Sequence, residues 1–328
     1  MKLMAIGDVF INEKIMEEAL KSKFGNDCEV LLFHFGYDDK QYMRGIVKKI
    51  EEFKSVGIPD GIFEVIEDVD IIMTHLCPVT SDMINRGKKL KYILSNRGGI
   101  ENIDIESANK NNIVVINNPE HNANAVAEYT IGLILNETRN ITRSDEALRN
   151  QIWQEDYPNS SDIKELRDLT IGIIGYGTIG KLVANKLNAL NCKILIYDYN
   201  NISKLYNEYE FTDLKKLLKS ADIITLHART NKQILNRKML SYLKEDAYVI
   251  NTARSNLIDN QELFNLLKNG KILGAALDVF DIEPLEKENE FLKLNNVTLT
   301  NHRAGDTLDS YIKSPLMLVE KLKKYIEL

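Results

Sequence analysis

The stretch Thr170-Ile-Gly-Ile-Ile174, followed at once by Gly175-Tyr-Gly177-Thr-Ile-Gly180, decides the fold around it. A short apolar run predicts a buried strand, and glycines at GxGxxG spacing then open a helical run. The first glycine permits a tight turn, the second lets the backbone approach a diphosphate, and the third allows close packing of helix on strand. A helix N-terminus favours negative charge, so the candidate dinucleotide-binding residues are Gly175, Gly177, Thr178, Ile179 and Gly180.

The next predicted strand ends in an acidic residue. Lys193–Tyr197 is a second apolar run, and Asp198 follows it, about 20 residues after the glycines. A carboxylate at this place accepts from the 2′-hydroxyl of an adenosine ribose and repels a 2′-phosphate. No arginine or lysine follows in Tyr199-Asn-Asn, so the pattern favours NAD over NADP. The alternative interpretation is a glycine turn that binds no ligand. The position of Asp198 relative to the glycines favours the dinucleotide site over this alternative.

The composition sets wide limits on function. With 328 residues, 44% hydrophobic and 27% charged, the chain is typical of a soluble globular protein long enough for two domains. It lacks the run of roughly 18 apolar residues that would span a bilayer, and Asp8 comes too early for a secretory segment. We therefore expect no membrane partner and a cytoplasmic location. A net charge of −6 argues against a nucleic-acid partner.

The cysteines and histidines suggest no metal site. Cys28, Cys77 and Cys192 are far apart and form no CxxC pair, which is typical of reduced core thiols. The five histidines have no paired ligand spacing either, so we expect no metal.

Short apolar runs alternate with amphipathic stretches along the chain, a pattern typical of parallel sheets with helices on both faces. In the first third, the expected strands are Lys2–Ile6, Val30–Phe33, Ile71–Thr74, Tyr92–Ser95 and Ile113–Ile116, with helices over Glu13–Lys21 and Ile46–Lys54. The expected strands of the middle are Thr170–Ile174, Lys193–Tyr197, Ile223–Leu226, Ala247–Ile250 and Gly274–Leu277. Asn122–Arg139 should form a connecting helix, and Leu316–Leu328 a terminal one.

Three chemically capable side chains follow later strands, where ligands of open α/β sheets bind. Arg254 follows Tyr248-Val-Ile-Asn-Thr-Ala, Glu283 lies in Asp278-Val-Phe-Asp-Ile-Glu-Pro284, and His302 follows Val297-Thr-Leu-Thr-Asn. Taken singly, each has an ordinary interpretation: a surface cation, a carboxylate before a proline, and an exposed histidine. Their significance depends on their occurring together.

With these motifs, the chain resembles the D-isomer-specific 2-hydroxyacid dehydrogenases over nearly its whole length. The matching segments, in the family's order, are SNRGGIENID (95–104), NANAVAEYTIGLIL (122–135), GYGTIG (175–180), INTARSNLID (250–259), GAALDVFDIEPL (274–285) and LTNHRAGDT (299–307). The resemblance implies an α/β fold of two doubly wound parallel-sheet domains. Residues 1–118 plus 305–328 would form a flavodoxin-like substrate domain, and residues 119–304 a Rossmann NAD-binding domain.

The resemblance also implies a reaction, hydride transfer between NAD(H) and C2 of a small D-2-hydroxy acid. Arg254 is similar to the arginine that binds the substrate carboxylate and polarises the 2-oxo group. His302 resembles the general acid/base, and Glu283 the carboxylate that orients its imidazole.

Further residues take their roles from the same resemblance. Asp278 aligns with a residue near the nicotinamide, and further cofactor contacts would come from His227, Ala228, Arg229, Thr252 and Ala253. Arg97, Gly98 and Gly99 match a cradle for the substrate carboxylate, and the added cation of Arg97 favours a polyhydroxylated or doubly anionic acid.

Other side chains are interpreted as structural. They are His75 and His121; Trp153, as a core or domain-contact aromatic; and Lys321, Lys323 and Lys324, as a solvated face.

The chain departs from the family pattern at two positions, and functions other than 2-hydroxy acid oxidation are also compatible with its motifs. Asn301 stands where proline is usual, and Ser255 where glycine is common. A non-catalytic NAD-binding sensor or corepressor is the main alternative function. Formate oxidation is disfavoured because those enzymes carry glutamine at the place of Glu283, while phosphite oxidation is less firmly excluded. The apolar segment Ala123–Leu135 predicts a homodimer.

Overall fold

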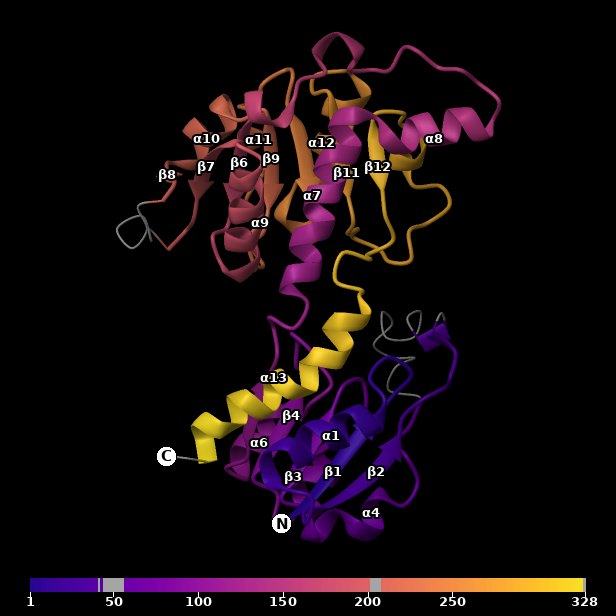
Figure 1. The fold of residues 1–328 in the computed structure, drawn as a ribbon, viewed down its shortest axis with the longest axis vertical. Helices are drawn as coiled ribbons and strands as arrows, with labels where there is room; N and C mark the ends of the chain where they lie inside the picture. The colour runs from indigo at the N-terminus through magenta and orange to yellow at the C-terminus, as the bar shows by residue number, and fades with distance from the viewer. Residues whose placement is uncertain (41, 44–55, 201–207, 327–328) are drawn as a thin grey trace. The chain divides into compact units, whose positions relative to one another are not determined.

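The computed structural model describes residues 1–40, 42–43, 56–200 and 208–326. The chain divides into two compact units, which we call unit 1 (Met1–Asn122 with Thr307–Leu328) and unit 2 (Ala123–Asp306). Each unit contains one parallel sheet with helices on both faces (Figure 1). The predicted α/β class with two parallel sheets is therefore confirmed.

The sheet of unit 1 is built from five parallel strands in the order β2-β1-β3-β4-β5. Their bounds are β1 (Lys2–Gly7), β2 (Glu29–His34), β3 (Ile71–Thr74), β4 (Tyr92–Ser95) and β5 (Val114–Asn117). The chain adds β2 on one side of β1 and β3 on the other, which is the flavodoxin-like order. Ligands of such sheets bind where this reversal occurs, outside the carboxyl ends of β1 and β3.

Helices cover both faces of this sheet because successive strand residues point to opposite sides. Leu3 and Ala5 face a buried apolar cluster shared with α1 (Glu13–Phe24) and α13 (Leu308–Ile326), whereas Met4 and Ile6 face another cluster. That second face is covered by α4 (Ile62–Val65), the 3-10 helix η1 (Ile66–Asp68), α5 (Ser81–Arg86) and α6 (Ile105–Lys110).

The terminal helix begins at Leu308, not at Leu316 as predicted. A proline usually interrupts a helix, but here Pro315 lies inside α13 and is buried together with Ser310 and Ser314. The packing of this turn against its own unit therefore outweighs the local preference. The helix predicted over 46–54 lies outside the described residues.

Unit 2 has seven parallel strands in the order β12-β11-β10-β9-β6-β7-β8. Their bounds are β6 (Thr170–Ile174), β7 (Lys193–Tyr197), β8 (Glu210–Phe211), β9 (Ile223–Leu226), β10 (Tyr248–Asn251), β11 (Gly274–Leu277) and β12 (Val297–Leu299). The first six follow the Rossmann order and β12 extends it. The two-residue β8 was not predicted, because so short a strand has no apolar period of its own.

Two groups of helices enclose this sheet. One face packs against α7 (Ala123–Arg139) and α9 (Thr178–Ala189), and the other against α10 (Leu214–Ser220), α11 (Arg237–Leu240) and α12 (Asn260–Lys268). The remaining elements are α8 (Ile141–Arg149) and the 3-10 helices η2 (Ser160–Asp162), η3 (Leu166–Asp168), η5 (Ser255–Leu257) and η6 (Glu290–Lys293).

The interpretation of Trp153 as a core aromatic and that of Lys321 as a solvated cation were wrong. Trp153 is 81% exposed rather than part of a core, because its segment follows α8 without packing on the sheet. Lys321 is not simply a solvated cation, since its Nζ donates to the Asn117 carbonyl and to Asn118 Oδ1. Of the free cysteines, Cys77 and Cys192 are buried and Cys28 is half-buried.

The described residues contain neither a membrane-spanning helix nor a cluster of metal-binding side chains. No helix there is both long and apolar enough to cross a membrane. Nor do three or more histidine, cysteine or carboxylate side chains of those residues converge as they would around a metal ion.

Candidate active site

The glycine loop of unit 2 has the geometry that its spacing predicts. Gly175 has φ 96°, and a Cβ there would lie 2.6 Å from the Ala228 nitrogen. A Cβ at Gly180 would overlap the Gly175 carbonyl oxygen, whereas one at Gly177 would meet nothing within 4 Å. No side chain caps α9 at Gly177, so its first turn, at Thr178 and Ile179, presents backbone N–H groups and a positive dipole end. The loop therefore fits a diphosphate at its open glycine.

Asp198 is tied to this loop. Its Oδ2 accepts from the Tyr176 nitrogen at 2.8 Å, and its Oδ1 accepts from the Asn200 nitrogen at 2.9 Å. Each carboxylate oxygen keeps a further lone pair for a ribose hydroxyl. The carboxylate thus lies beside the glycines, at the carboxyl end of β7.

The segment His227–Arg229 closes the same end of the sheet. The His227 backbone nitrogen donates to the Ile174 carbonyl, and its Nε2 lies 2.9 Å from Thr225 Oγ1. Burial lowers the pKa of the imidazole to about 3, so the ring is neutral. Its Nδ1 is buried and lacks a hydrogen-bond partner among the described residues. Ala228 packs against Gly175, and Arg229 is exposed.

The three predicted reactive residues follow neighbouring strands of unit 2: Arg254 after β10, Glu283 after β11 and His302 after β12. His302 Nδ1 lies 2.8 Å from Glu283 Oε2 and 3.1 Å from Oε1. The glutamate side chain is 15% exposed and the histidine side chain 42%. This leaves the imidazole accessible while its Nδ1 is engaged.

Asp278 holds the loop that carries His302. It is fully buried, and its oxygens accept from Thr300 Oγ1 at 2.6 Å and from the nitrogens of Arg303 and Ala304, both at 2.9 Å. His302 lies between these anchors with φ 58°, a left-handed conformation that costs about 1–3 kcal/mol in a non-glycine residue. Asp278 therefore restrains a strained backbone around the imidazole.

The segment around Arg254 is also anchored. Thr252 is buried and its Oγ1 lies 2.8 Å from Thr130 Oγ1 on α7. The Ala253 nitrogen donates to Asn251 Oδ1, and the Arg254 guanidinium donates to the Ala253 carbonyl at 2.7 Å. The exposed guanidinium thus extends from a fixed backbone.

The predicted carboxylate cradle lies in unit 1, after β4. The Asn118 nitrogen donates to the Arg97 carbonyl at 2.8 Å, and Asn117 Nδ2 donates to the Gly98 carbonyl at 2.7 Å. In a trans peptide the N–H points opposite to the carbonyl, so the N–H groups of Gly98 and Gly99 are directed away from these contacts. The carboxylate of Glu101 occupies the space where a Cβ of Gly99 would lie.

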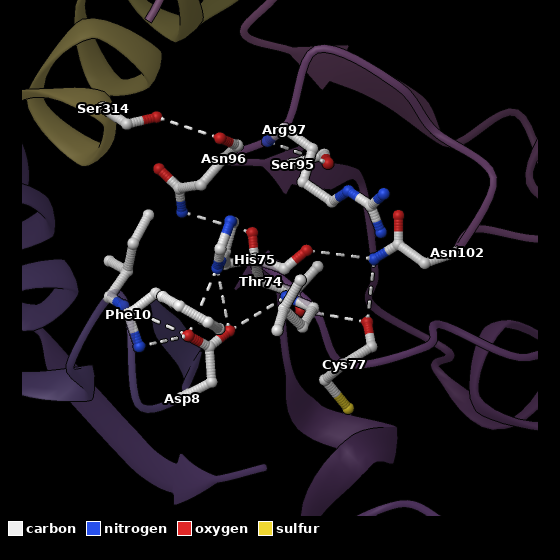
Figure 2. Close-up of polar contacts among 12 residues, drawn as sticks. Asp8, Phe10, Thr74, His75, Cys77, Ser95, Asn96, Arg97, Asn102 and Ser314 are labelled. Carbon is white, nitrogen blue, oxygen red and sulfur yellow. Dashed lines mark hydrogen bonds and ion pairs between the residues drawn. The ribbon is translucent and has the colours of Figure 1, made fainter. Parts of the chain in front are cut away.

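A second histidine–carboxylate pair in unit 1 was missed from the sequence. Asp8 follows β1, His75 follows β3, and His75 Nδ1 lies 2.9 Å from Asp8 Oδ2 (Figure 2). The sequence interpretation left Asp8 without a role and His75 as structural. The available signal was their position directly after strands, which had singled out His302. His121, by contrast, bonds the Asn118 carbonyl, and burial lowers its pKa to about 4.

Comparison with known proteins identifies the family. The D-isomer specific 2-hydroxyacid dehydrogenase, NAD binding domain, matches residues 131–304. Hydroxypyruvate reductase of Thermotoga maritima is 34% identical over 81% of this chain and 87% of its own length. D-3-phosphoglycerate dehydrogenase of Methanocaldococcus jannaschii is 34% identical over 85% of this chain, which spans only 55% of that longer protein.

Solved structures agree with this relationship. An acyclic imino acid reductase in complex with NADPH and D-Arg is 30% identical, with a TM-score of 0.74 over 100% of this chain and 97% of its own. D-2-hydroxyisocaproate dehydrogenase, at 23% identity and a TM-score of 0.77 over 99% of this chain and 97% of its own, shares the fold. The chain belongs to the D-isomer specific 2-hydroxyacid dehydrogenase family, and the cofactor of this oxidoreductase is NAD.

Proposed function

We propose that the chain interconverts a small D-2-hydroxy acid and its 2-oxo acid through Arg254, Glu283 and His302. The observation that supports this most is the His302–Glu283 pair, with Nδ1 and Oε2 2.8 Å apart beside an accessible imidazole. The bound nicotinamide would supply or accept the hydride. Such a pair can move the accompanying proton, because Glu283 holds Nδ1 and leaves Nε2 to face the substrate hydroxyl.

In the reductive direction, His302 begins protonated and its Nε2–H donates to the 2-oxo oxygen. The oxygen takes this proton as C2 gains the hydride, which leaves neutral imidazole and a 2-hydroxy acid. Glu283 stabilises the imidazolium before transfer, and Arg254 binds the substrate carboxylate through its planar guanidinium. Asp278 keeps the His302 loop in place through Thr300, Arg303 and Ala304.

The residues that bind NAD would be those of the glycine loop and of the strand ends beside it. Gly175, Gly177 and Gly180 shape the diphosphate site, and Asp198 accepts from the ribose. We assign each predicted domain a role on this basis. Residues 119–304 would bind NAD, and residues 1–118 plus 305–328 would contribute the Arg97–Gly99 cradle for the substrate carboxylate.

The test is to follow NADH absorbance with a panel of 2-oxo acids. Relatives named hydroxypyruvate reductase and glyoxylate reductase suggest both acids, and larger and doubly charged acids complete the panel. We expect turnover of at least one acid and its loss in His302→Gln. Tight NADH binding without turnover of any acid would instead favour a non-catalytic sensor.

We further propose a homodimer, although α7 does not support it as predicted. Most apolar residues of α7 are buried within unit 2. Support comes instead from exposed apolar side chains on and after α8: Ile141 at 55%, Leu148 at 56%, Ile152 at 55% and Trp153 at 81%. Sedimentation should give a dimer that Trp153→Ser weakens, and a monomer at micromolar concentration would contradict it.

We also propose a cytoplasmic location, because the three cysteines are free thiols, which persist in a reducing compartment. Cell fractionation tests this location.

A further inference from the structure

A pair of threonines ties helix α7 to the end of β10 in unit 2. Thr130 lies on α7, Thr252 follows β10 directly, and both side chains are buried. Their Oγ1 atoms lie 2.8 Å apart, which is the distance of a hydrogen bond between two hydroxyls. The two residues are 122 positions apart in the chain, so only the tertiary structure brings them together.

The direction of this hydrogen bond follows from a second contact of Thr130. Its Oγ1 also lies 2.8 Å from the backbone carbonyl oxygen of Val126, one turn earlier on α7. A carbonyl has no proton, so Thr130 must donate in this contact, and a hydroxyl has only one proton to give. Thr252 therefore donates to Thr130 in the bond between the two hydroxyls. This bond uses the proton of Thr252 and leaves lone pairs on its Oγ1.

Thr252 Oγ1 is consequently a hydrogen-bond acceptor that is held in one orientation. Thr130 Oγ1 is its only hydrogen-bond partner in the described part of the chain. The backbone beside it is also held, because Asn251 Oδ1 accepts from the Ala253 nitrogen and Asn251 Nδ2 donates to the Arg254 carbonyl. An oxygen that has no proton to donate, on an anchored backbone, selects a donor group from any ligand beside it.

The strand order puts Thr252 on the nicotinamide side of the proposed cofactor site. The glycine loop follows β6, and Asp198, the proposed ribose acceptor, follows β7 on one side of it. A dinucleotide crosses the carboxyl ends of such a sheet, so its other half reaches toward β9 and β10 on the opposite side of β6. Arg254, the proposed substrate ligand, comes two residues after Thr252.

Other polar side chains at these strand ends are already engaged by the protein. Asp278, after β11, accepts from three groups of the loop that carries His302. Thr225 Oγ1, on β9, lies 2.9 Å from His227 Nε2. Thr252 Oγ1, at the end of the strand between them, keeps its lone pairs for a ligand.

We propose that Thr130 is a positioning residue for the cofactor: it takes the proton of Thr252 in a hydrogen bond, so that Thr252 Oγ1 accepts from the carboxamide N–H₂ of the nicotinamide. The inference rests on the proposed cofactor site but not on the identity of the 2-oxo acid. A carboxamide has a donor end and an acceptor end, and Thr252 attracts only the donor end. The pair thus favours the natural cofactor over an analogue that lacks this N–H₂.

The decisive variant is Thr130→Val, which keeps the branched shape of the side chain but removes the hydroxyl. The measurement is titration calorimetry of the full chain with NADH and with its reduced 3-acetylpyridine analogue, in which a methyl group replaces the N–H₂. We expect the unaltered chain to bind NADH about 3- to 10-fold more tightly than the analogue, as one hydrogen bond predicts. In Thr130→Val the proton of Thr252 is no longer held, so this ratio should fall to about 1.

Two further variants separate positioning from simple packing. Thr130→Ser restores the hydroxyl without the methyl group, so the ratio should return to that of the unaltered chain. Thr252→Val removes the acceptor itself and should give the same low ratio, which keeps the inference testable if Thr130→Val does not fold. An equal loss of affinity for NADH and for the analogue in the valine variants would mean a structural tie only and would overturn the inference.

The chain offers a matched control in Thr138. This residue is also buried on α7, and its Oγ1 donates to the Ile134 carbonyl at 2.8 Å, the same contact that Thr130 makes with Val126. Among the described residues, no other side chain donates to its hydroxyl. Thr138→Val should therefore leave the ratio of the two affinities unchanged. A fall in the ratio as large as in Thr130→Val would contradict the specific role of Thr130.

Binding measured without turnover separates this inference from the proposed reaction. Equal affinities of the unaltered chain for NADH and the analogue would refute the role of Thr130, even if the chain reduces 2-oxo acids. A chain that binds NADH with the expected preference but reduces no 2-oxo acid would refute the proposed function and leave the inference intact.

Discussion

The two histidine–carboxylate pairs of this chain have the same bond in opposite surroundings. Nδ1 lies 2.8 Å from Glu283 in unit 2 and 2.9 Å from Asp8 in unit 1, and each pair joins the ends of neighbouring strands. The His302 side chain is 42% exposed, whereas that of His75 is 10% exposed and that of Asp8 is fully buried.

The difference shows what such a pair can do. An accessible imidazole exchanges protons with a substrate and with water, which a general acid/base must do in every turnover. A buried one is held rigidly by its carboxylate, which favours recognition or stability. The bond length alone therefore does not separate the two roles, and the surroundings do.

The largest expected effect is on the catalytic rate, and it concerns the exposed His302–Glu283 pair. His302→Gln should lower kcat by about 10²–10⁴-fold, because the 2-oxo oxygen then lacks a proton donor. Steady-state kinetics with NADH and the best 2-oxo acid measures this, with the melting temperature as a folding control. A near-normal rate in a folded variant would remove His302 from the reaction.

The buried pair should dominate in stability. Asp8→Asn weakens the hydrogen bond with His75 and turns an amide N–H₂ toward backbone donors, so we expect a loss of about 1.5–3 kcal/mol in the free energy of unfolding. Urea denaturation measures it. A loss below about 1 kcal/mol would show that Asp8 is not the anchor that its burial indicates.

For the exposed pair, His302 and Glu283, we expect a large effect on the rate and a small effect on stability. Glu283→Gln should lower kcat about 10- to 100-fold, because the imidazolium of His302 loses its stabilising charge. Its free energy of unfolding should change by less than about 1 kcal/mol, as is usual for ion pairs in contact with solvent. If Glu283→Gln and Asp8→Asn destabilise the chain equally, the contrast between the pairs fails.

The smallest effect is a dependence of stability on pH. The pKa of Asp8 in the folded chain lies below its ordinary value of 3.8, so the unfolded chain binds the proton more readily. Asp8 therefore contributes stability above pH 3.8, and this contribution is lost as the pH falls through the lower folded pKa. The difference in unfolding free energy between the unaltered chain and Asp8→Asn should be constant above pH 5 and shrink below about pH 4. A difference independent of pH would contradict it.

Local patterns were sufficient for the strands and for the glycine loop. The expected Ile71–Thr74, Tyr92–Ser95, Thr170–Ile174 and Lys193–Tyr197 are the observed bounds, since strands buried on both faces are continuous apolar runs with polar ends. The pairing of Glu283 with His302 came from the resemblance to the family rather than from a local pattern, and His302 Nδ1 lies 2.8 Å from Glu283 Oε2.

Side chains whose partners are distant in sequence could not be placed this way. Asp8 and His75 are 67 residues apart, and only the order β2-β1-β3 brings them together. The exposure of Trp153, the bonds of Lys321 and the continuation of α13 through Pro315 were also misjudged.

The amino-acid sequence by itself thus determined the class of fold, the strands and the dinucleotide loop, because these depend on apolar periodicity and on the small size of glycine at short range. Tertiary structure alone decided that Asp8 meets His75 and how much water reaches each of the two histidine–carboxylate pairs. Those properties depend on strand order and on packing between segments far apart in the chain, which no local pattern contains.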